Sequence, residues 1–289
     1  MSAERGKFSA EDEVRVLNRH LVDKVPVSTL GDQQGPHPTL FNNQQKDFFE
    51  DGAAALDGKN DAKQTPMDFS RISIIILTKN AGRLFPKMLE GLFACTGIDE
   101  TEIILIDSGS EDLTLEYAAR YPRIKVHRIL PAEFGHGRTR NLGARLAQGD
   151  ILIYLVQDAT PAAPDFLTRL TAPLSDSRVA AVYGRQLPQA FANPVEQFFL
   201  GETYPAIPRK GAYTASSKAT IRNIFFSNVC SAIRRQVWAR VPFDESLIMS
   251  EDQQWAKEVL TTGFLIIYEP GATVWHSHNY RLKQVLQRN

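Results

Sequence analysis

The chain has 289 residues, with 33 basic and 33 acidic side chains, so its formal net charge is zero. Balanced charge without a long run of one sign gives no electrostatic basis for binding nucleic acid, and we exclude that class of partner. The length and the 43% of hydrophobic residues suit a large α/β domain with a buried core. Cys95 and Cys230 lie far apart in apolar stretches, so we expect two reduced, buried thiols.

Residues 1–70 form a predicted N-terminal extension that is rich in Asp, Gln, Asn, Gly and Pro and largely flexible. Within it, residues 11–24 place Val14, Leu17 and Leu21 at helical spacing, which predicts a short helix. The first residues lack the apolar core of a signal peptide, and no stretch has the length of a membrane-spanning helix. We therefore expect a cytoplasmic protein.

The next part of the chain alternates between short apolar runs and segments with helical periodicity. The predicted strands are 72–77, 103–106, 124–129 and 151–156, and the predicted helices are 83–94, 112–121 and 139–148, the last closed by Gly149 as its C-cap. Continuous β-branched runs are typical of strands buried on both faces of a sheet. The series predicts an α/β fold with a doubly wound, mostly parallel sheet, whose ligand lies beyond the carboxyl ends of the strands.

The second half of the chain has a less regular pattern. We expect a helical turn at 165–170, strands at 179–183, 228–233 and 264–268, a helix at 250–262, and an irregular excursion over 185–220. Long loops inside compact domains are more often functional than idle.

Polar clusters follow the first two predicted strands. Thr78-Lys79-Asn80 comes directly after the first strand, and Asp107-Ser108-Gly109-Ser110 after the second. A carboxylate at such an edge can accept hydrogen bonds from a nucleobase or a ribose, and Gly109 would let a ligand approach closely. We predict that Asp107 binds a ligand while Ser110 or Asp112 caps the next helix.

Two further clusters suggest anion and metal binding. Gln157-Asp158 follows the fourth strand, where a carboxylate either caps the chain or ligates a divalent cation that holds a diphosphate. Residues 134–141 open the third helix with two glycines and two arginines, which suits an anion site. Within that segment we expect His136 to serve as a hydrogen-bonding loop residue rather than a catalytic base.

Two clusters occur near the C-terminal end. Glu251 and Asp252 open a helix, so they serve either as helix-capping carboxylates or as a base that takes a proton from an acceptor hydroxyl. His276 and His278 alternate along a predicted extended segment, so we expect at most one of them to face a site.

Taken in order, these clusters resemble inverting family-2 glycosyltransferases of the GT-A fold, within the bacterial rhamnosyltransferase-like group. The motifs that carry the resemblance are SIIILTKN (73–80), IDSGSED (106–112), FGHGRTRNLGA (134–144), QDATP (157–161), SEDQQWA (250–256) and HSHNY (276–280). The resemblance covers residues 72–289. It implies a domain over 71–289, with a nucleotide-sugar-binding half at 71–160 and an acceptor-binding half at 161–289.

The resemblance also implies a role for each site residue. The implied donor-binding residues are Thr78, Asn80, Asp107, Ser108, Arg140, Gln157 and Asp158. Asp158 and His278 would hold Mg²⁺ or Mn²⁺, Asp252 would be the catalytic base, and Glu251 and Trp255 would position the acceptor. The family's usual metal motif has two acids separated by one residue, whereas Gln157-Asp158-Ala159 supplies one acid.

The implied reaction transfers a sugar, with dTDP-rhamnose as the expected donor, to a saccharide or lipid-linked acceptor of a bacterial surface or extracellular polysaccharide. Peripheral association with the inner face of the cell membrane would follow from such an acceptor. The alternatives are a nucleotidyltransferase, for which residues 78–82 are a poor signature loop, and a non-catalytic sugar-nucleotide-binding module, against which Glu251 and Asp252 argue. A serine hydrolase is excluded because no G-x-S-x-G motif is present.

Overall fold

The computed structural model describes residues 68–207, 209–211 and 224–278, which belong to the unit formed by residues 66–289. The helix predicted within residues 11–24, and the rest of the extension up to residue 67, lie outside the described residues. None of the described helices is long and apolar enough to span a membrane.

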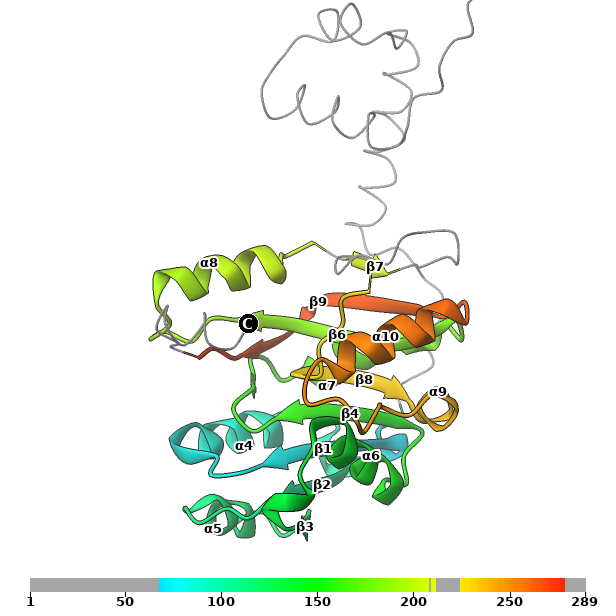
Figure 1. Cartoon of the computed structure of the whole chain (residues 1–289). Helices are drawn as coiled ribbons and strands as arrows, with labels where there is room; N and C mark the ends of the chain where they lie inside the picture. The colour runs from blue at the N-terminus through cyan, green and yellow to red at the C-terminus, as the bar shows by residue number, and fades with distance from the viewer. Residues whose placement is uncertain (1–67, 208, 212–223, 279–289) are drawn as a thin grey trace, which may run out of the picture. The chain divides into compact units, whose positions relative to one another are not determined.

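The described chain is built on a nine-stranded sheet with the order β3-β2-β1-β4-β8-β6-β9-β5, and β7 pairs with β9 (Figure 1). The strands are β1 (Ile72–Thr78), β2 (Glu102–Asp107), β3 (Ile124–Arg128), β4 (Ile151–Val156), β5 (Thr160–Pro161), β6 (Val179–Leu187), β7 (Arg209–Gly211), β8 (Cys230–Arg234) and β9 (Leu265–Trp275). The helices are α4 (Phe85–Phe93), α5 (Thr114–Ala119), α6 (His136–Leu146), α7 (Phe166–Thr171), α8 (Pro194–Thr203), α9 (Arg235–Arg240) and α10 (Glu251–Thr261).

The parallel half of the sheet matches the prediction from the apolar runs. β1 pairs in parallel with β2 on one side and β4 on the other, and β2 pairs in parallel with β3. Ile72, Ile74, Ile75 and Ile76 of β1 have no exposed surface, as expected for a central strand covered on both faces. The carboxyl ends of these strands therefore meet at one edge of the sheet.

All strand pairs of β3-β2-β1-β4 are parallel, whereas the second half of the sheet combines parallel and antiparallel pairs. β8 runs antiparallel to both β4 and β6, whereas β6 and β9 are parallel, with irregular register near Gly184. β5 and β7 each pair antiparallel with β9. β9 thus has three neighbours, and it brings distant parts of the chain together.

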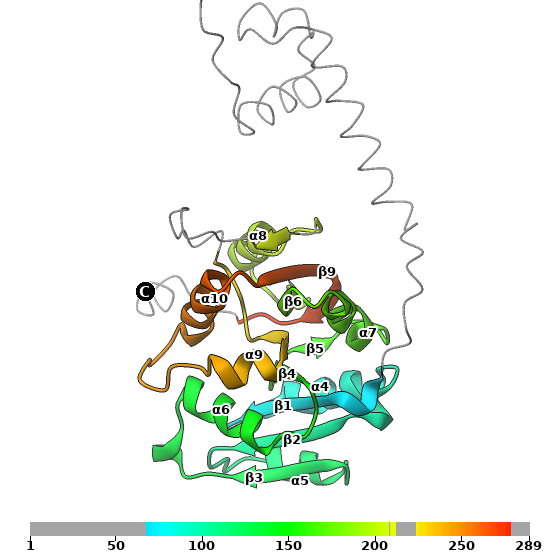
Figure 2. The same ribbon diagram turned by 90° about the vertical axis from the view of Figure 1, so that its right-hand side faces the viewer.

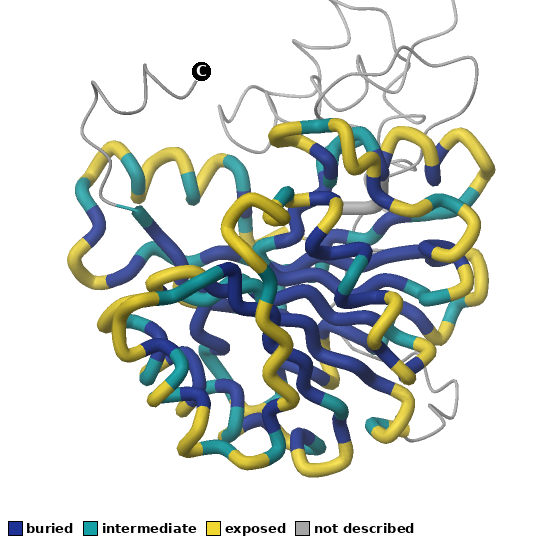
Figure 3. Tube along the Cα trace, turned by 60° about the horizontal axis from the view of Figure 1, so that its bottom comes forward, coloured by how far each residue is buried: buried dark blue, intermediate teal, exposed yellow. Residues whose placement is uncertain are grey.

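Helices cover both faces of the sheet and bury two apolar clusters. α4, α5 and α7 pack on one face, whereas α6, α9 and α10 pack on the other (Figure 2). The central strands lie buried between these layers, and exposed segments lie at the periphery (Figure 3). Cys95 and Cys230 are both free and buried, as expected.

The segment 185–220 is more regular than predicted. β6 continues to Leu187, helix α8 follows, and β7 lies at Arg209–Gly211, while residues 208 and 212–220 lie outside the described residues. Asn193 caps α8 by accepting a hydrogen bond from the N–H of Glu196, and Pro194 occupies the first helical position. This Asn-Pro start is a recognised helix signal that the apolar pattern alone does not carry.

Gly149 does not form the predicted C-cap, because α6 ends earlier, with Ala147 as its C-cap in an extended conformation. Gly149 instead lies against the backbone that enters β1. A Cβ atom at this position would lie 2.7 Å from the carbonyl oxygen of Arg71 and 2.7 Å from the nitrogen of Ser73. The glycine is therefore required by close approach of two backbone segments.

We predict that Gly149→Ala lowers the free energy of unfolding by about 1–3 kcal/mol, because the backbone at β1 must shift to accept the methyl group. The matched control is Gly201→Ala in α8, where the added Cβ would meet nothing within 4 Å. A helical Gly→Ala change at an open position is neutral or stabilising by up to ~1 kcal/mol. Equal urea midpoints for the two variants would contradict this account of Gly149.

Candidate active site

The loop after β1 is tied to the loop after β2 by reciprocal hydrogen bonds. The N–H of Asn80 donates to Ser110 Oγ at 2.8 Å, and the N–H of Glu111 donates to Asn80 Oδ1 at 2.8 Å. Asn80 has a φ of +46°, a left-handed conformation that asparagine tolerates better than most residues. The two loops thus form one exposed edge at the carboxyl end of the sheet.

The buried Asp107 side chain holds the loop after β2 in its turn. Its side chain has no exposed surface, and its Oδ1 accepts from the N–H groups of Gly109 and Ser110 at 3.1 and 3.0 Å. Its Oδ2 accepts from the hydroxyls of Ser110 and Thr78 at 2.5 and 3.2 Å. The expected direct contact of Asp107 with a nucleoside is therefore not present in this arrangement, because the carboxylate is saturated by its own turn.

Thr78 and Ser108 are buried in the same turn, and Ser108 donates both its N–H and its hydroxyl to the carbonyl of Thr78. Asn80 is the exposed member of the residues predicted to contact the nucleoside. Asp112 accepts from the N–H of Thr114, the first residue of α5, at 3.0 Å, which is a helix-start role. Hydrogen bonds from Thr114 hold the pKa of Asp112 below its usual value.

Gln157 joins the end of β4 to the same edge. Its Oε1 accepts from the N–H of Lys79 at 2.9 Å, and its Nε2 donates to the carbonyl oxygen of Lys79 at 3.4 Å. The amide side chain thus holds the β1 loop beside Asp158, the next residue along the chain.

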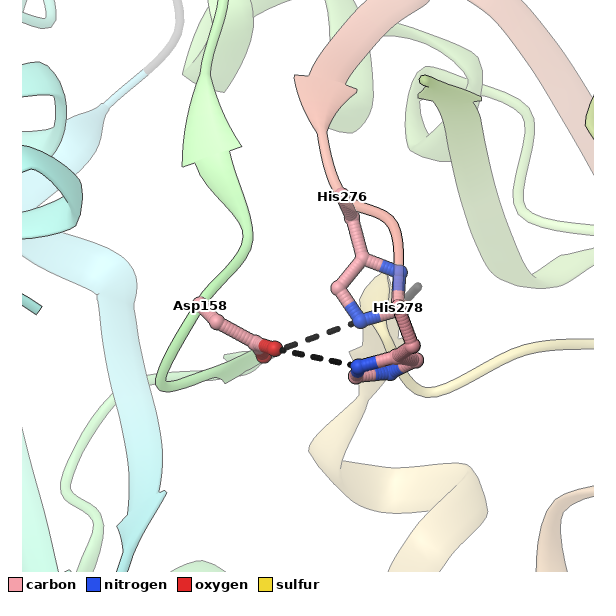
Figure 4. Close-up of side chains that lie close together, drawn as sticks. All are labelled: Asp158, His276 and His278. Atoms are coloured by element: carbon pink, nitrogen blue, oxygen red, sulfur yellow. Dashed lines mark ion pairs between the residues drawn. The ribbon is translucent and has the colours of Figure 1, made fainter. Parts of the chain in front are cut away.

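Asp158 faces two imidazoles (Figure 4). One oxygen of Asp158 lies 3.6 Å from His276 Nε2, and the other lies 3.6 Å from His278 Nδ1. Potential ligand atoms of the three residues all lie within 4.8 Å of one another. Within the described ranges, this is the cluster of three or more metal-ligating side chains that the fold assembles.

The expectation that at most one of the two histidines faces a site is wrong. Strict alternation of side chains holds only within a strand, and β9 ends at Trp275, before both histidines. The N–H of His276 donates to the carbonyl of Leu187, and the N–H of His278 donates to Glu196 of α8. The sequence favours His278 over His276 as a ligand, because the partners that orient the two residues are distant in sequence.

The three residues fit a divalent cation. The set combines one carboxylate with two imidazoles, which suits ions such as Mn²⁺. Burial lowers the pKa of His276 to about 4, so its ring is neutral near pH 7 and keeps a lone pair available to a metal. His276 would also supply a third ligand where the sequence motif offers a single acid.

Asp252 lies in the first turn of α10. Its Oδ1 accepts from the N–H of Gln253 at 2.9 Å and its Oδ2 from the N–H of Asn228 at 3.4 Å. Burial, together with the charge of Glu251, raises the pKa of Asp252 to about 6, whereas Arg140 and these hydrogen bonds oppose the shift. A carboxylate with a raised pKa is a stronger proton acceptor than an ordinary aspartate.

Arg140 and Glu251, which the sequence assigned to separate ligands, instead pair with each other. Arg140 donates from Nη1 to Glu251 Oε1 at 2.7 Å, and both side chains are buried. The pair connects α6 with α10 beneath Asp252. A buried charge without its partner is costly, so the pair holds the two helices in one arrangement.

Trp255 does not line an acceptor site, and that expectation is wrong. Its side chain is 1% exposed and packs against Phe226 and Phe243, and its indole N–H donates to the carbonyl of Val241 at 2.7 Å. On the helix α10, position 255 faces the core rather than the edge that carries Asp252. Trp255 is therefore a core residue that anchors α10.

An open α/β sheet that is covered by helices on both faces, with polar clusters at the carboxyl edge of its parallel strands, is the architecture of the GT-A fold. The chain belongs to glycosyl transferase family 2, whose family description matches residues 73–241. It is an enzyme of that family.

Two curated relatives cover most of the chain. It is 36% identical to the O-antigen chain rhamnosyltransferase RfbN of Salmonella typhimurium over 220 residues. This match covers 75% of this chain and 70% of that protein. It is 33% identical to the O-antigen chain rhamnosyltransferase WbaN of Salmonella anatum over 218 residues. This match covers 75% of this chain and 69% of that protein.

Solved structures share the fold. A mannosyltransferase from Pyrobaculum calidifontis in complex with GDP-Man and Mn²⁺ matches 75% of this chain and 59% of its own, with a TM-score of 0.56 and 20% identity. S. aureus TarS in complex with UDP-GlcNAc matches 75% of this chain and 60% of its own, with a TM-score of 0.58 and 16% identity. This chain therefore spans about six tenths of these solved chains, and the likeness establishes the fold.

We predict that Glu251→Gln lowers the pKa of Asp252 from about 6, because the substitution removes the neighbouring negative charge and frees Arg140 to act on Asp252. Carbon-detected NMR of the aspartate carboxyl group measures this pKa directly. The control is Glu258→Gln, on the exposed face of the same helix, which should leave the titration in place. A pKa of Asp252 that is the same in both variants would contradict this assignment.

Proposed function

We propose that this protein is an inverting glycosyltransferase that transfers rhamnose from a nucleoside-diphosphate donor, dTDP-rhamnose, to a growing bacterial surface polysaccharide. The observation that carries the proposal is that the fold presents two chemically distinct groups. These are the Asp158–His276–His278 cluster and the Asp252 carboxylate, whose pKa is raised. The rhamnosyltransferase names of the two curated relatives support the choice of sugar and of polysaccharide.

Asp158, His276 and His278 would hold Mg²⁺ or Mn²⁺ between the two proposed halves of the domain, since Asp158 belongs to 71–160 and both histidines to 161–289. When bound, the ion would balance the negative charge that develops on the departing nucleoside diphosphate. The Mn²⁺ in the solved mannosyltransferase supports this choice of cofactor class. The exposed side chain of Asn80 and the buried Asp107 turn would shape the nucleoside end of the site.

Asp252 would accept the proton of the acceptor hydroxyl as its oxygen attacks the anomeric carbon. The new C–O bond forms on the face opposite the diphosphate, whose oxygen leaves with the bonding electron pair, so the anomeric configuration inverts. The raised pKa of Asp252 strengthens it as a proton acceptor, and its bonds to the N–H groups of Asn228 and Gln253 hold the carboxylate in place. Arg140 and Glu251 act as positioning residues beneath it.

The acceptor would be lipid-linked, and the protein would meet the membrane through α8. Val195, Phe198 and Phe199 of this helix are 56%, 64% and 60% exposed. Exposed aromatic side chains gathered on one helix favour contact with an apolar phase. The same helix contacts the metal cluster, since Glu196 accepts from the N–H of His278, so a lipid-bound acceptor would be delivered beside the donor.

We predict that dTDP binds in a metal-dependent manner and more tightly than UDP or GDP. Calorimetric titration of the three nucleotides, each with and without Mn²⁺, measures both preferences. Asp158→Asn should remove the metal dependence, whereas Asp165→Asn, which changes a half-buried aspartate paired with Arg169, should retain it. If Mn²⁺ changes nucleotide affinity equally in wild type and Asp158→Asn, then Asp158 is not a ligand.

We predict that Asp252→Asn lowers kcat by about 10²–10⁴-fold, the usual contribution of a general base, while nucleotide affinity stays within a few-fold of wild type. For the wild type, kcat/KM should fall as the pH drops below about 6, because a protonated carboxyl cannot accept the hydroxyl proton. The base assignment fails if Asp252→Asn loses nucleotide binding and transfer in parallel.

We predict that the wild type co-sediments with phosphatidylglycerol-containing vesicles and that Phe198→Ser/Phe199→Ser releases it. The control is Leu113→Ser, an exposed apolar residue beside α5, which should bind vesicles like the wild type. Soluble-acceptor transfer should be unchanged in all of them. Equal sedimentation of the α8 variant and the wild type would refute this role of α8.

A further inference from the structure

A buried glutamine lies directly behind the metal cluster. Gln186 of β6 is 5% exposed, and its Oε1 lies 2.8 Å from His276 Nδ1. Its Nε2 donates to the hydroxyl of Tyr204 at 2.5 Å and to Ser227 Oγ at 3.2 Å. Every polar atom of this amide therefore has a partner, and one of the partners is a proposed metal ligand.

The contacts of Gln186 bear on the tautomer of His276. A neutral imidazole carries one N–H, and the nitrogen that carries it cannot bind a metal. With the amide oxygen facing the ring, Nδ1 holds the proton and Nε2 presents its lone pair towards Asp158. With the amide turned round, its NH₂ group would face Nδ1, and the proton would move to Nε2, on the metal side.

The spacing at the cluster favours the first arrangement. His276 Nε2 and the Asp158 oxygen are 3.6 Å apart, which is longer than an N–H···O hydrogen bond. Two ligand atoms that share one ion at bond lengths near 2.1 Å are separated by about 3–3.5 Å. The pair is thus spaced like two ligands of an ion rather than like a donor and its acceptor.

The backbone around Gln186 fixes the same ring in place. The N–H of His276 donates to the carbonyl of Leu187, and Gln186 pairs with Val274 in the β6–β9 ladder. Tyr204, at the C-cap of α8, and Ser227 are both buried, so the amide cannot turn towards water. Both the main chain and the side chain of residues 186–187 therefore orient His276.

We propose that Gln186 is a positioning residue that holds His276 in the Nδ1–H tautomer, with Nε2 bare for the divalent cation. Partners of this kind on metal-ligating histidines commonly change metal affinity by 10–100-fold when they are lost. The inference rests on the metal site of the proposed function, although the tautomer itself can be measured without metal.

The test combines two measurements on the full chain. Long-range ¹⁵N–¹H NMR of the metal-free protein reports the tautomer of His276, with its signals assigned by their loss in His276→Asn. Calorimetric titration of Mn²⁺ alone reports affinity. In Gln186→Leu, Mn²⁺ should bind about 10–100-fold more weakly, and the Nδ1–H tautomer should no longer dominate. Gln186→Glu keeps an acceptor oxygen at Nδ1, so it should restore both readouts.

The matched control is Gln189→Leu. Gln189 is also buried and holds the same strand end, through the carbonyl of Trp275 and the hydroxyl of Ser277, but no bond joins it to an imidazole. It should leave the tautomer and Mn²⁺ affinity as in the wild type. An Nε2–H tautomer in the wild type, or equal Mn²⁺ affinity in wild type and Gln186→Leu, would overturn the inference. A wild type with the Nδ1–H tautomer that binds no Mn²⁺ would refute the metal site instead.

Discussion

The pairing of the two-residue strand β5 with the end of β9 is the contact on which the site depends. Thr160 lies opposite Trp275, so Asp158, two residues before β5, and His276, directly after β9, are brought to one place although 118 positions separate them. Neither half of the fold contains the cluster alone. The parallel strands deliver Asp158 at their carboxyl edge, as open α/β sheets do, and the mixed half delivers both histidines.

A second, electrostatic constraint surrounds the proposed base. Three charged groups, Arg140, Glu251 and Asp252, lie together where α6 meets α10. Arg140 neutralises Glu251 by a direct bond, which leaves Asp252 as the carboxylate without an arginine bonded to it and with a pKa raised by burial. Environment thus separates two adjacent carboxylates, with Glu251 in a structural ion pair and Asp252 in the proposed role of base. The proposed metal site and base are joined through consecutive residues, because Ser227 contacts Gln186 while Asn228 contacts Asp252.

Sequence patterns predicted the parallel strands β1 to β4 well, but they predicted poorly the rest of the sheet and the burial of individual side chains. The apolar runs located β1 to β4 because strands buried on both faces have an unambiguous composition. They did not predict α8, because its apolar side chains are exposed rather than arranged on a buried face. They also did not predict the order of β8, β6 and β9 in the sheet, which depends on contacts between distant residues. Within the site, motif positions identified Asp158, His278 and Asp252 as candidates, and these remain predictions. The sequence does not show which side chains are buried, so it places Trp255 on a ligand surface and Asp107 in direct contact with a nucleoside. It also does not show the contact between His276 and Gln186.

The most direct test of the proposed metal site is a crystal structure with Mn²⁺ and dTDP, with anomalous diffraction recorded at the manganese edge. We expect one manganese peak within bonding distance of Asp158, His276 Nε2 and His278 Nδ1, and also of the diphosphate oxygens of the nucleotide. A bound nucleotide with manganese held elsewhere, or with none of these three side chains as a ligand, would contradict it.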